Sequence, residues 1–277
     1  MKSIGYFGLF DILGYSRMNE GNNLDSLIDI FTRNIVGVDQ SAVTLAGAAR
    51  QQQLFSFAEV KTILFSDMII FYEESPKPEL VGKGIIDPSQ FMLKACTLLR
   101  LAFEGGIPLR GAISFGEYYV HERTFLGKPI IEARNFEVNQ EWSGAALCKS
   151  AEDEYLRRLQ IFQEKHVAPL ISNGSRENVN PILPHNFVTM DCLYKYPIPC
   201  KESDREGLAL CWDDSVYIMS KLRDIRPGIE RLNLKYKKQI NKRIEEKFSA
   251  HRKPLDKKVK RMIKNTTDFI FKVKDRF

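Results

Sequence analysis

Two strongly apolar segments, each interrupted by a single carboxylate, constrain this chain more than any other feature. Asp11 lies in YFGLFDILGY and Asp67 lies in ILFSDMIIFY. Both segments are short and rich in aromatic and β-branched residues, so they predict strands, the second one a hairpin around Phe65-Ser66-Asp67. Burying a bare carboxylate among apolar side chains is costly unless a cation compensates for it. Neither segment contains a cation of its own.

A divalent metal bound by both carboxylates would compensate for both. Mg²⁺ is commonly held by one or two carboxylates together with substrate phosphates, so two facing strands with one Asp each suit a site for a metal and a nucleotide. The alternative is that each Asp only ends its strand and begins a turn, which Gly14 and Ser66 make possible. Because the pair occupies the same relative place in two strands, we favour the metal site.

Two further cues point to phosphate. Asp11 is followed by Ile-Leu-Gly-Tyr-Ser, a strand end with a glycine, where exposed backbone amides can cradle phosphate oxygens. Arg110 stands at the head of another apolar strand, and arginine matches phosphate geometry with two parallel hydrogen bonds. The alternatives are an ordinary turn at Gly14 and a surface arginine at a strand end.

The order of apolar patterns along the chain predicts an α+β fold, with one sheet rich in antiparallel strands and helices on one face. Alternation and composition predict strands over 4–13, 57–65, 67–74, 107–120, 186–199 and 208–214, with a second hairpin through 121–127. Three- and four-residue spacing predicts helices over 24–38, 89–106 and 128–167, and two more near the C-terminal end that are separated near Pro254.

The charge divides the chain into two parts. The 277 residues carry 41 Lys and Arg against 35 Asp and Glu, a net charge of +6. Residues 219–277 alone carry 20 basic and 7 acidic residues, so the part before them is acidic. We therefore expect an acidic body over 1–218 and a basic amphipathic helical tail over 219–277. The tail either binds nucleic acid or an acidic membrane surface, or packs on the body or a dimer mate; we favour packing and do not expect nucleic acid as a partner.

Cysteine and histidine usage excludes two common kinds of site. Five cysteines, an odd number with no C-x-x-C spacing, argue against a disulfide framework and a zinc cluster, and the four histidines are scattered. Any metal is therefore expected to be a hard, oxygen-binding one. No stretch has the roughly 18 apolar residues of a membrane span, and Asp11 interrupts the first apolar run, so we expect neither a span nor a signal peptide, and a cytoplasmic location.

Four segments together resemble the class III nucleotidyl cyclases, the adenylate and guanylate cyclase family. FDILGYS and FSDMIIF resemble the two metal motifs, LRGAISFGE resembles the R-x-G strand, and FLGKPIIEARNFE resembles the helix that carries transition-state residues. The resemblance covers roughly residues 4–150 and implies a ferredoxin-like cyclase domain with the basic helical region as a C-terminal extension. The motifs FDILG, FSD and RGAI together most resemble the bacterial pyrimidine cyclases of the Pycsar antiphage system and their cyclase-domain relatives.

The resemblance implies a site and a reaction. Asp11, Asp67 and the carbonyl of Ile12 would hold two Mg²⁺ or Mn²⁺ ions, and Arg110 would hold the triphosphate together with a run of backbone groups. That run is Ile12, Leu13, Gly14, Tyr15 and Ser16. The ribose 3′-oxygen of a nucleoside triphosphate would attack the α-phosphate and release pyrophosphate. Family enzymes are homodimers with shared sites, so the hairpin over 118–125 would be a dimerisation arm.

This chain departs from the family at four positions. The transition-state Asn and Arg fall on Ile131 and Asn135, with Arg134 one residue away, and the base-selecting positions fall on Ile63 and Thr124. The resemblance then implies a pyrimidine substrate, CTP or UTP, whose 3′,5′-cyclic product would serve as an antiphage signal read by a cyclic-nucleotide-responsive effector. The alternative is a degenerate cyclase-like domain that binds a nucleotide or a partner without turnover. The intact aspartates favour catalysis.

Overall fold

The computed structural model describes residues 2–36, 38, 59–74, 89–122, 124–162, 164, 192–213, 229–250 and 256–273. The predicted boundary at 218/219 lies outside these residues. So do residues 186–191 of the strand predicted over 186–199, and the end of the predicted helix at 165–167.

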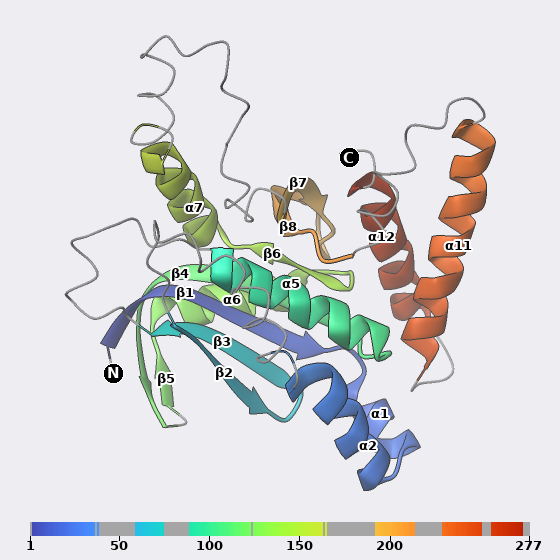
Figure 1. Cartoon of the computed structure of the whole chain (residues 1–277), viewed down its shortest axis with the longest axis horizontal. Coiled ribbons are helices and arrows are strands. Elements are labelled where there is room, and N and C mark those ends of the chain that lie inside the picture. Colours follow the sequence, from blue (N-terminus) through green and yellow to red (C-terminus); the bar gives the residue numbers. More distant parts are fainter. Residues whose placement is uncertain are drawn as a thin grey trace, which may run out of the picture.

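Within the described residues one eight-stranded sheet forms the centre of the molecule (Figure 1). Its order is β2-β3-β1-β4-β6-β8-β7, with β5 paired to β4, and all neighbours are antiparallel except β4 and β6. The strands are β1 (Lys2–Ile12), β2 (Glu59–Phe65), β3 (Met68–Glu74), β4 (Leu109–His121), β5 (Thr124–Leu126), β6 (Gly144–Leu147), β7 (Leu193–Ile198) and β8 (Arg205–Leu210). The mixed, mostly antiparallel sheet with helices confirms the α+β class.

The helices cover both faces of this sheet. They are α1 (Tyr15–Gly21), α2 (Leu24–Phe31) with a π-helical turn η1 (Thr32–Val36), α5 (Ser89–Glu104), α6 (Lys128–Asn139), α7 (Lys149–Phe162), α11 (Ile229–Ser249) and α12 (Lys257–Val273). Side chains alternate across a strand. On β1, Tyr6 and Phe10 therefore pack with α5 and α7, whereas Phe7 and Leu9 pack with Ala133 of α6. The helices are thus not confined to one face: α6 covers the face opposite α5, because that face of β1 is apolar as well.

The expectation of one continuous helix over 128–167 is wrong in its middle. Helix α6 ends at Asn139, and Gly144–Leu147 form β6, which lies between β4 and β8. All four residues of β6 are buried. A strand this short, made of small and apolar residues and buried on both faces, has no alternation that could reveal it in the sequence.

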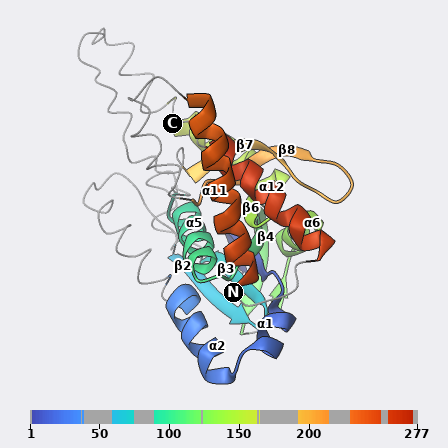
Figure 2. The same ribbon diagram turned by 90° about the vertical axis from the view of Figure 1, so that its right-hand side faces the viewer.

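The C-terminal helices pack on the sheet (Figures 1 and 2). Ile244 and Phe248 of α11 and Phe269 of α12 belong to the same hydrophobic core as the sheet. The ring of Phe269 meets that of Trp142 edge-on at 4.6 Å. Trp142 is fully buried. The tail therefore packs on the body, and the division at 218/219 stays a prediction. Among the described helices, none is long and apolar enough to cross a membrane.

Candidate functional site

The C-terminal end of β1 brings the two predicted aspartates together. Asp11 pairs in register with Met68 at the start of β3, and the amide of Ile12 donates a hydrogen bond of 2.9 Å to the carbonyl of Asp67. Asp67 lies in the turn between β2 and β3, after Ser66 with a positive φ of 56°. Asp11 therefore lies within its strand and Asp67 within a turn, at one end of the sheet.

A cation reaches Asp11 from the neighbouring strand. Arg110 lies directly opposite Asp11 in the β1–β4 register, and its guanidinium Nη2 is 3.4 Å from Asp11 Oδ2. The same guanidinium donates to Glu137 Oε1 at 2.6 Å through Nε and to the carbonyl of Gln140 at 3.1 Å. Arg110 is buried, so it is not the surface arginine of the alternative interpretation. Its guanidinium is also already bonded, so it is not freely presented to a triphosphate.

Two carboxylates share this arginine, and the environment affects both. Burial raises the pKa of Asp11 above its usual value; Arg110 opposes this shift, the charge of Asp67 adds to it, and Arg134 and Lys258 oppose it. Burial also raises the pKa of Glu137, with Arg110 opposing and Asp11 adding. Bringing a further cation to Asp11 is therefore electrostatically favourable.

Two of the predicted phosphate-binding amides already donate hydrogen bonds to backbone carbonyls. The Ile12 amide donates to Asp67, and the Leu13 amide donates to the carbonyl of Pro108 at 3.0 Å. Phosphate binding through these two N–H groups is therefore a prediction that the structure does not allow. Gly14, with a φ of 77°, precedes α1, and the amides of Tyr15 and Ser16 lie in the first turn, where helical N–H groups lack an intrahelical acceptor.

The structure separates the remaining predicted residues. Arg134 on α6 donates to Glu137 Oε2 at 2.8 Å and acts electrostatically on Asp11, so it belongs to the site, whereas Asn135 is exposed on the same helix. Ile63 is half-buried in β2 and pairs with Ile70. Thr124 pairs with His121 at the far end of β4, roughly 35 Å along that strand from Arg110 at the usual rise per residue. Thr124 does not reach Asp11 within one chain.

The donor set at this end of the sheet fits a hard divalent cation. Within the described residues, Asp11 Oδ1 and the carboxylate of Asp67 make no hydrogen bond or ion pair, and Asp11 Oδ2 has only the longer contact to Arg110. Carboxylate oxygens are the ligands that Mg²⁺ and Mn²⁺ prefer. No cluster of three or more His, Cys, Asp or Glu side chains suited to a metal exists in the described part of the chain.

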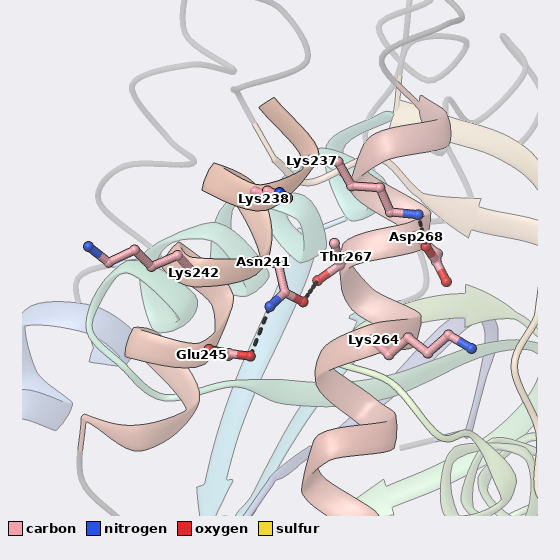
Figure 3. A pocket seen from close by; sticks show the side chains of 8 residues that line it. All are labelled: Lys237, Lys238, Asn241, Lys242, Glu245, Lys264, Thr267 and Asp268. Carbon is pink, nitrogen blue, oxygen red and sulfur yellow. Dashed lines mark hydrogen bonds and ion pairs between the residues drawn. The ribbon is translucent and has the colours of Figure 1, made fainter. Parts of the chain in front are cut away.

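A separate groove of 520 Å³ lies between the outer faces of α11 and α12 (Figure 3). Its lining is rich in lysine and contains an ion pair between Lys237 and Asp268 and a hydrogen bond between Asn241 and Thr267. None of the lining residues comes from β1, β3 or β4, so the groove is not part of the site around Asp11.

Sequence reasoning missed three contributors to the site. Glu137 is the last residue of the segment FLGKPIIEARNFE, and a Glu on the buried side of α6 requires a cation. The Gln140 carbonyl, which accepts from Arg110, gives no signal in sequence, because a backbone group is present at every position. Lys258, whose charge acts on Asp11, lies about 250 residues away in the chain, so only the fold can reveal it.

No family model matches this chain, and no curated protein matches it. The solved structures that resemble it include adenylyl and guanylyl cyclases. A dimeric guanylyl cyclase domain of the RhoGC fusion protein from the aquatic fungus Blastocladiella emersonii is 11% identical, with a TM-score of 0.38 over 55% of this chain and 84% of that one. An adenylate/guanylate cyclase/hydrolase from Silicibacter pomeroyi is 14% identical, with a TM-score of 0.35 over 77% and 99%. Both TM-scores lie below 0.5, so we draw nothing about activity from these likenesses.

Proposed function

We propose that this protein is a nucleotidyl cyclase that converts a nucleoside triphosphate, CTP or UTP, into a 3′,5′-cyclic nucleotide and pyrophosphate. The observation that carries the proposal is that Asp11 and Asp67 lie together at one end of the sheet, where the carboxylate of Asp67 has no hydrogen bond or ion pair within the described residues. The cyclase-like motifs single out these same two residues, and their proximity supports the proposal.

The residues of the site divide the work. Asp11, Asp67 and the carbonyl of Ile12 would hold two Mg²⁺ or Mn²⁺ ions, which ease deprotonation of the ribose 3′-hydroxyl and neutralise phosphate charge when bound. The amides of Gly14, Tyr15 and Ser16 bind phosphate oxygens. The 3′-oxygen then attacks the α-phosphorus in line, and the bond to the bridging oxygen breaks as pyrophosphate leaves.

Arg110 acts differently from the role that the motif implies. Its guanidinium holds Glu137 and the Gln140 carbonyl and lies beside Asp11. It therefore positions the metal-binding carboxylate and balances the buried charge of Glu137. Arg134, half exposed and tied to Glu137, is the residue of this group that can turn toward the developing charge on the phosphate.

We further propose a homodimer with shared sites. Thr124 cannot reach Asp11 of its own chain, so a role in base selection requires a second copy. The β4–β5 hairpin carries exposed apolar side chains suited to such contact, with Leu126 59% exposed. Ile63 and Thr124 replace the polar pair that selects purines in the family, which supports a pyrimidine base. A cytoplasmic antiphage role, with an effector that reads the cyclic product, follows from the resemblance to Pycsar cyclases.

One observation favours a second candidate function, a cyclase-like domain that binds a nucleotide or a partner without turnover. Ile131, which occupies the position of the transition-state Asn, is 63% exposed on α6, and Asn135 replaces the Arg. An apolar side chain there cannot stabilise phosphate charge. The basic α11–α12 region would then serve a partner or nucleic acid.

Product analysis separates the two. The full chain is incubated with Mn²⁺ or Mg²⁺ and each of ATP, GTP, CTP and UTP, and products are identified by mass spectrometry. We expect a cyclic pyrimidine nucleotide, reduced at least about 100-fold in Asp11→Asn and in Asp67→Asn, but not in the exposed control Asp25→Asn. Absence of any cyclic product above the Asp variants contradicts turnover, and nucleotide binding by the same protein would then support the second candidate.

A further inference from the structure

Helix α12 lies against the segment that supports the candidate site. Arg261 pairs with the Glu141 carboxylate at 2.7 Å, Asn265 donates to the Glu141 carbonyl at 2.7 Å, and the Ser143 amide donates to Thr266 at 2.8 Å. Gln140, the residue before Glu141, accepts from Arg110. The segment 140–143 therefore touches α12 on one side and the arginine beside Asp11 on the other. Figure 2 shows α12 in front of β6 and β4.

One face of α12 contacts this segment. Lys258, Arg261 and Asn265 recur at three- and four-residue spacing, which places them on one helix face. Since Arg261 and Asn265 both contact Glu141, Lys258 lies one turn further toward the start of the helix on the same face.

A second contact fixes the start of α12 beside the phosphate-binding turn. Asp256 caps α12 by accepting from the Val259 amide at 2.9 Å, and it also pairs with Arg17 of α1 at 3.2 Å. Helix α1 begins directly after Gly14. Lys258 thus lies between two contacts of α12. Asp256 pairs with α1, and Arg261 pairs with the segment next to Arg110.

Lys258 itself has an exposed ammonium group that forms no ion pair within the described residues. It stands between the contact of α12 with α1 and the contact of α12 with the segment next to Arg110, so its charge lies on the side of α12 that adjoins the candidate site. An exposed lysine on this side of α12 suits a ligand that brings negative charge to the candidate site, which a nucleoside triphosphate does.

We propose that Lys258 binds the phosphates of the nucleotide substrate, so that the C-terminal helix α12 completes a site whose other residues lie in the first half of the chain. This inference rests on the proposed function, since it concerns the same site. It assigns to the basic tail a specific role in substrate binding in addition to packing.

Triphosphate binding by Lys258 variants tests the proposal. Binding of CTP, UTP and inorganic tripolyphosphate to the full chain is measured by calorimetry with Ca²⁺, and steady-state kinetics are measured with Mn²⁺. We expect Lys258→Gln to weaken binding of all three about fivefold to tenfold and to raise KM more than it lowers kcat, because one charge-assisted phosphate contact is lost. Lys258→Arg should retain most of the affinity.

The matched control is Lys260→Gln, which removes the same charge about 200° around the helix. Both lysines are exposed, so neither variant should change the melting temperature. Unchanged binding in Lys258→Gln, an equal loss in Lys260→Gln, or a wild-type chain that binds none of the three probes overturns the proposal. If the wild type binds these probes through Lys258 but makes no cyclic product, the proposed catalytic activity is contradicted and the role of Lys258 in binding is supported.

Discussion

Arg110 is the residue on which the charge balance of the site depends. It is buried between Glu137, which is fully inaccessible to solvent, and the partly exposed Asp11. Removing the cation that pairs with a buried carboxylate strongly destabilises the folded protein. The same guanidinium therefore stabilises the fold and orients a candidate metal ligand.

A double-mutant cycle measures this balance. We expect Arg110→Gln to lower the free energy of unfolding by about 3 kcal/mol, because Glu137 keeps a buried charge with a weaker partner. Adding Glu137→Gln should recover part of the loss, since both charges are then gone. Urea denaturation gives the four values. Arg134→Gln is the control: its side chain is 49% exposed, so its loss should stay below about 1 kcal/mol. Equal losses in Arg110→Gln and Arg134→Gln would contradict this balance.

At the scale of elements, α11 is fixed to α5 by a cluster of charges. Arg243 pairs with Glu104 at the end of α5 and with the buried Asp213 at 3.1 Å, and Lys247 pairs with Glu104 at 3.0 Å. Burial raises the pKa of Glu104, but hydrogen bonds from Lys247 and Arg243 outweigh it, so the pKa lies below its usual 4.5. The cluster joins the tail to the body through polar contacts as well as through the core.

This cluster predicts a pH-dependent contribution to stability. A carboxyl whose pKa is lower in the folded state stabilises the fold above its unfolded pKa and loses that contribution as pH falls through the folded value. We expect Glu104→Gln to cost about 1 kcal/mol at pH 7, since Glu104 is half exposed. The difference from wild type should shrink as the pH falls below 4.5. Urea denaturation from pH 7 to pH 3.5 measures it; a difference that grows toward low pH would contradict the assignment.

At the scale of the whole molecule, the proposed site is incomplete in one chain. The β4–β5 hairpin extends from the sheet with Thr124 and Leu126 on its short strand β5. Arg134, in contrast, already reaches the Asp11 group within the same chain. In the proposed homodimer, the second copy would supply Thr124 for base selection, whereas the carboxylates and Arg134 come from one chain.

Leu126→Glu tests the dimer. The variant places a charge on an exposed side chain far from Asp11, so the fold should be unaffected, while an apolar interface would be weakened. Light scattering should give twice the 31.9 kDa of the chain for the wild type and a shift toward monomer for the variant. Cyclic nucleotide production should fall with dimer content. The exposed, polar position Glu122→Gln is the control, and a wild-type monomer that is fully active would contradict the shared site.

Several elements could be predicted from the sequence because their signals are local. The strands around Asp11 and Asp67, the hairpin between β2 and β3, and helix α5 each have a clear apolar pattern and a turn that fixes their ends. The short strand β6 could not be predicted, because four buried small residues have no periodicity. The coverage of the second face by α6 followed only from the packing of Ala133 on Phe7 and Leu9.

The sequence by itself determined the two carboxylates, the apolar strand patterns around them and the basic character of the tail, because residue type and local spacing decide these. Only the tertiary structure decided that Arg110 is bonded to Glu137, that the Ile12 and Leu13 amides are already hydrogen-bonded, and that α12 packs on the segment next to Arg110. The physical reason is that a charge interacts with whatever the fold brings within a few ångströms, and no local pattern records which distant residue that will be.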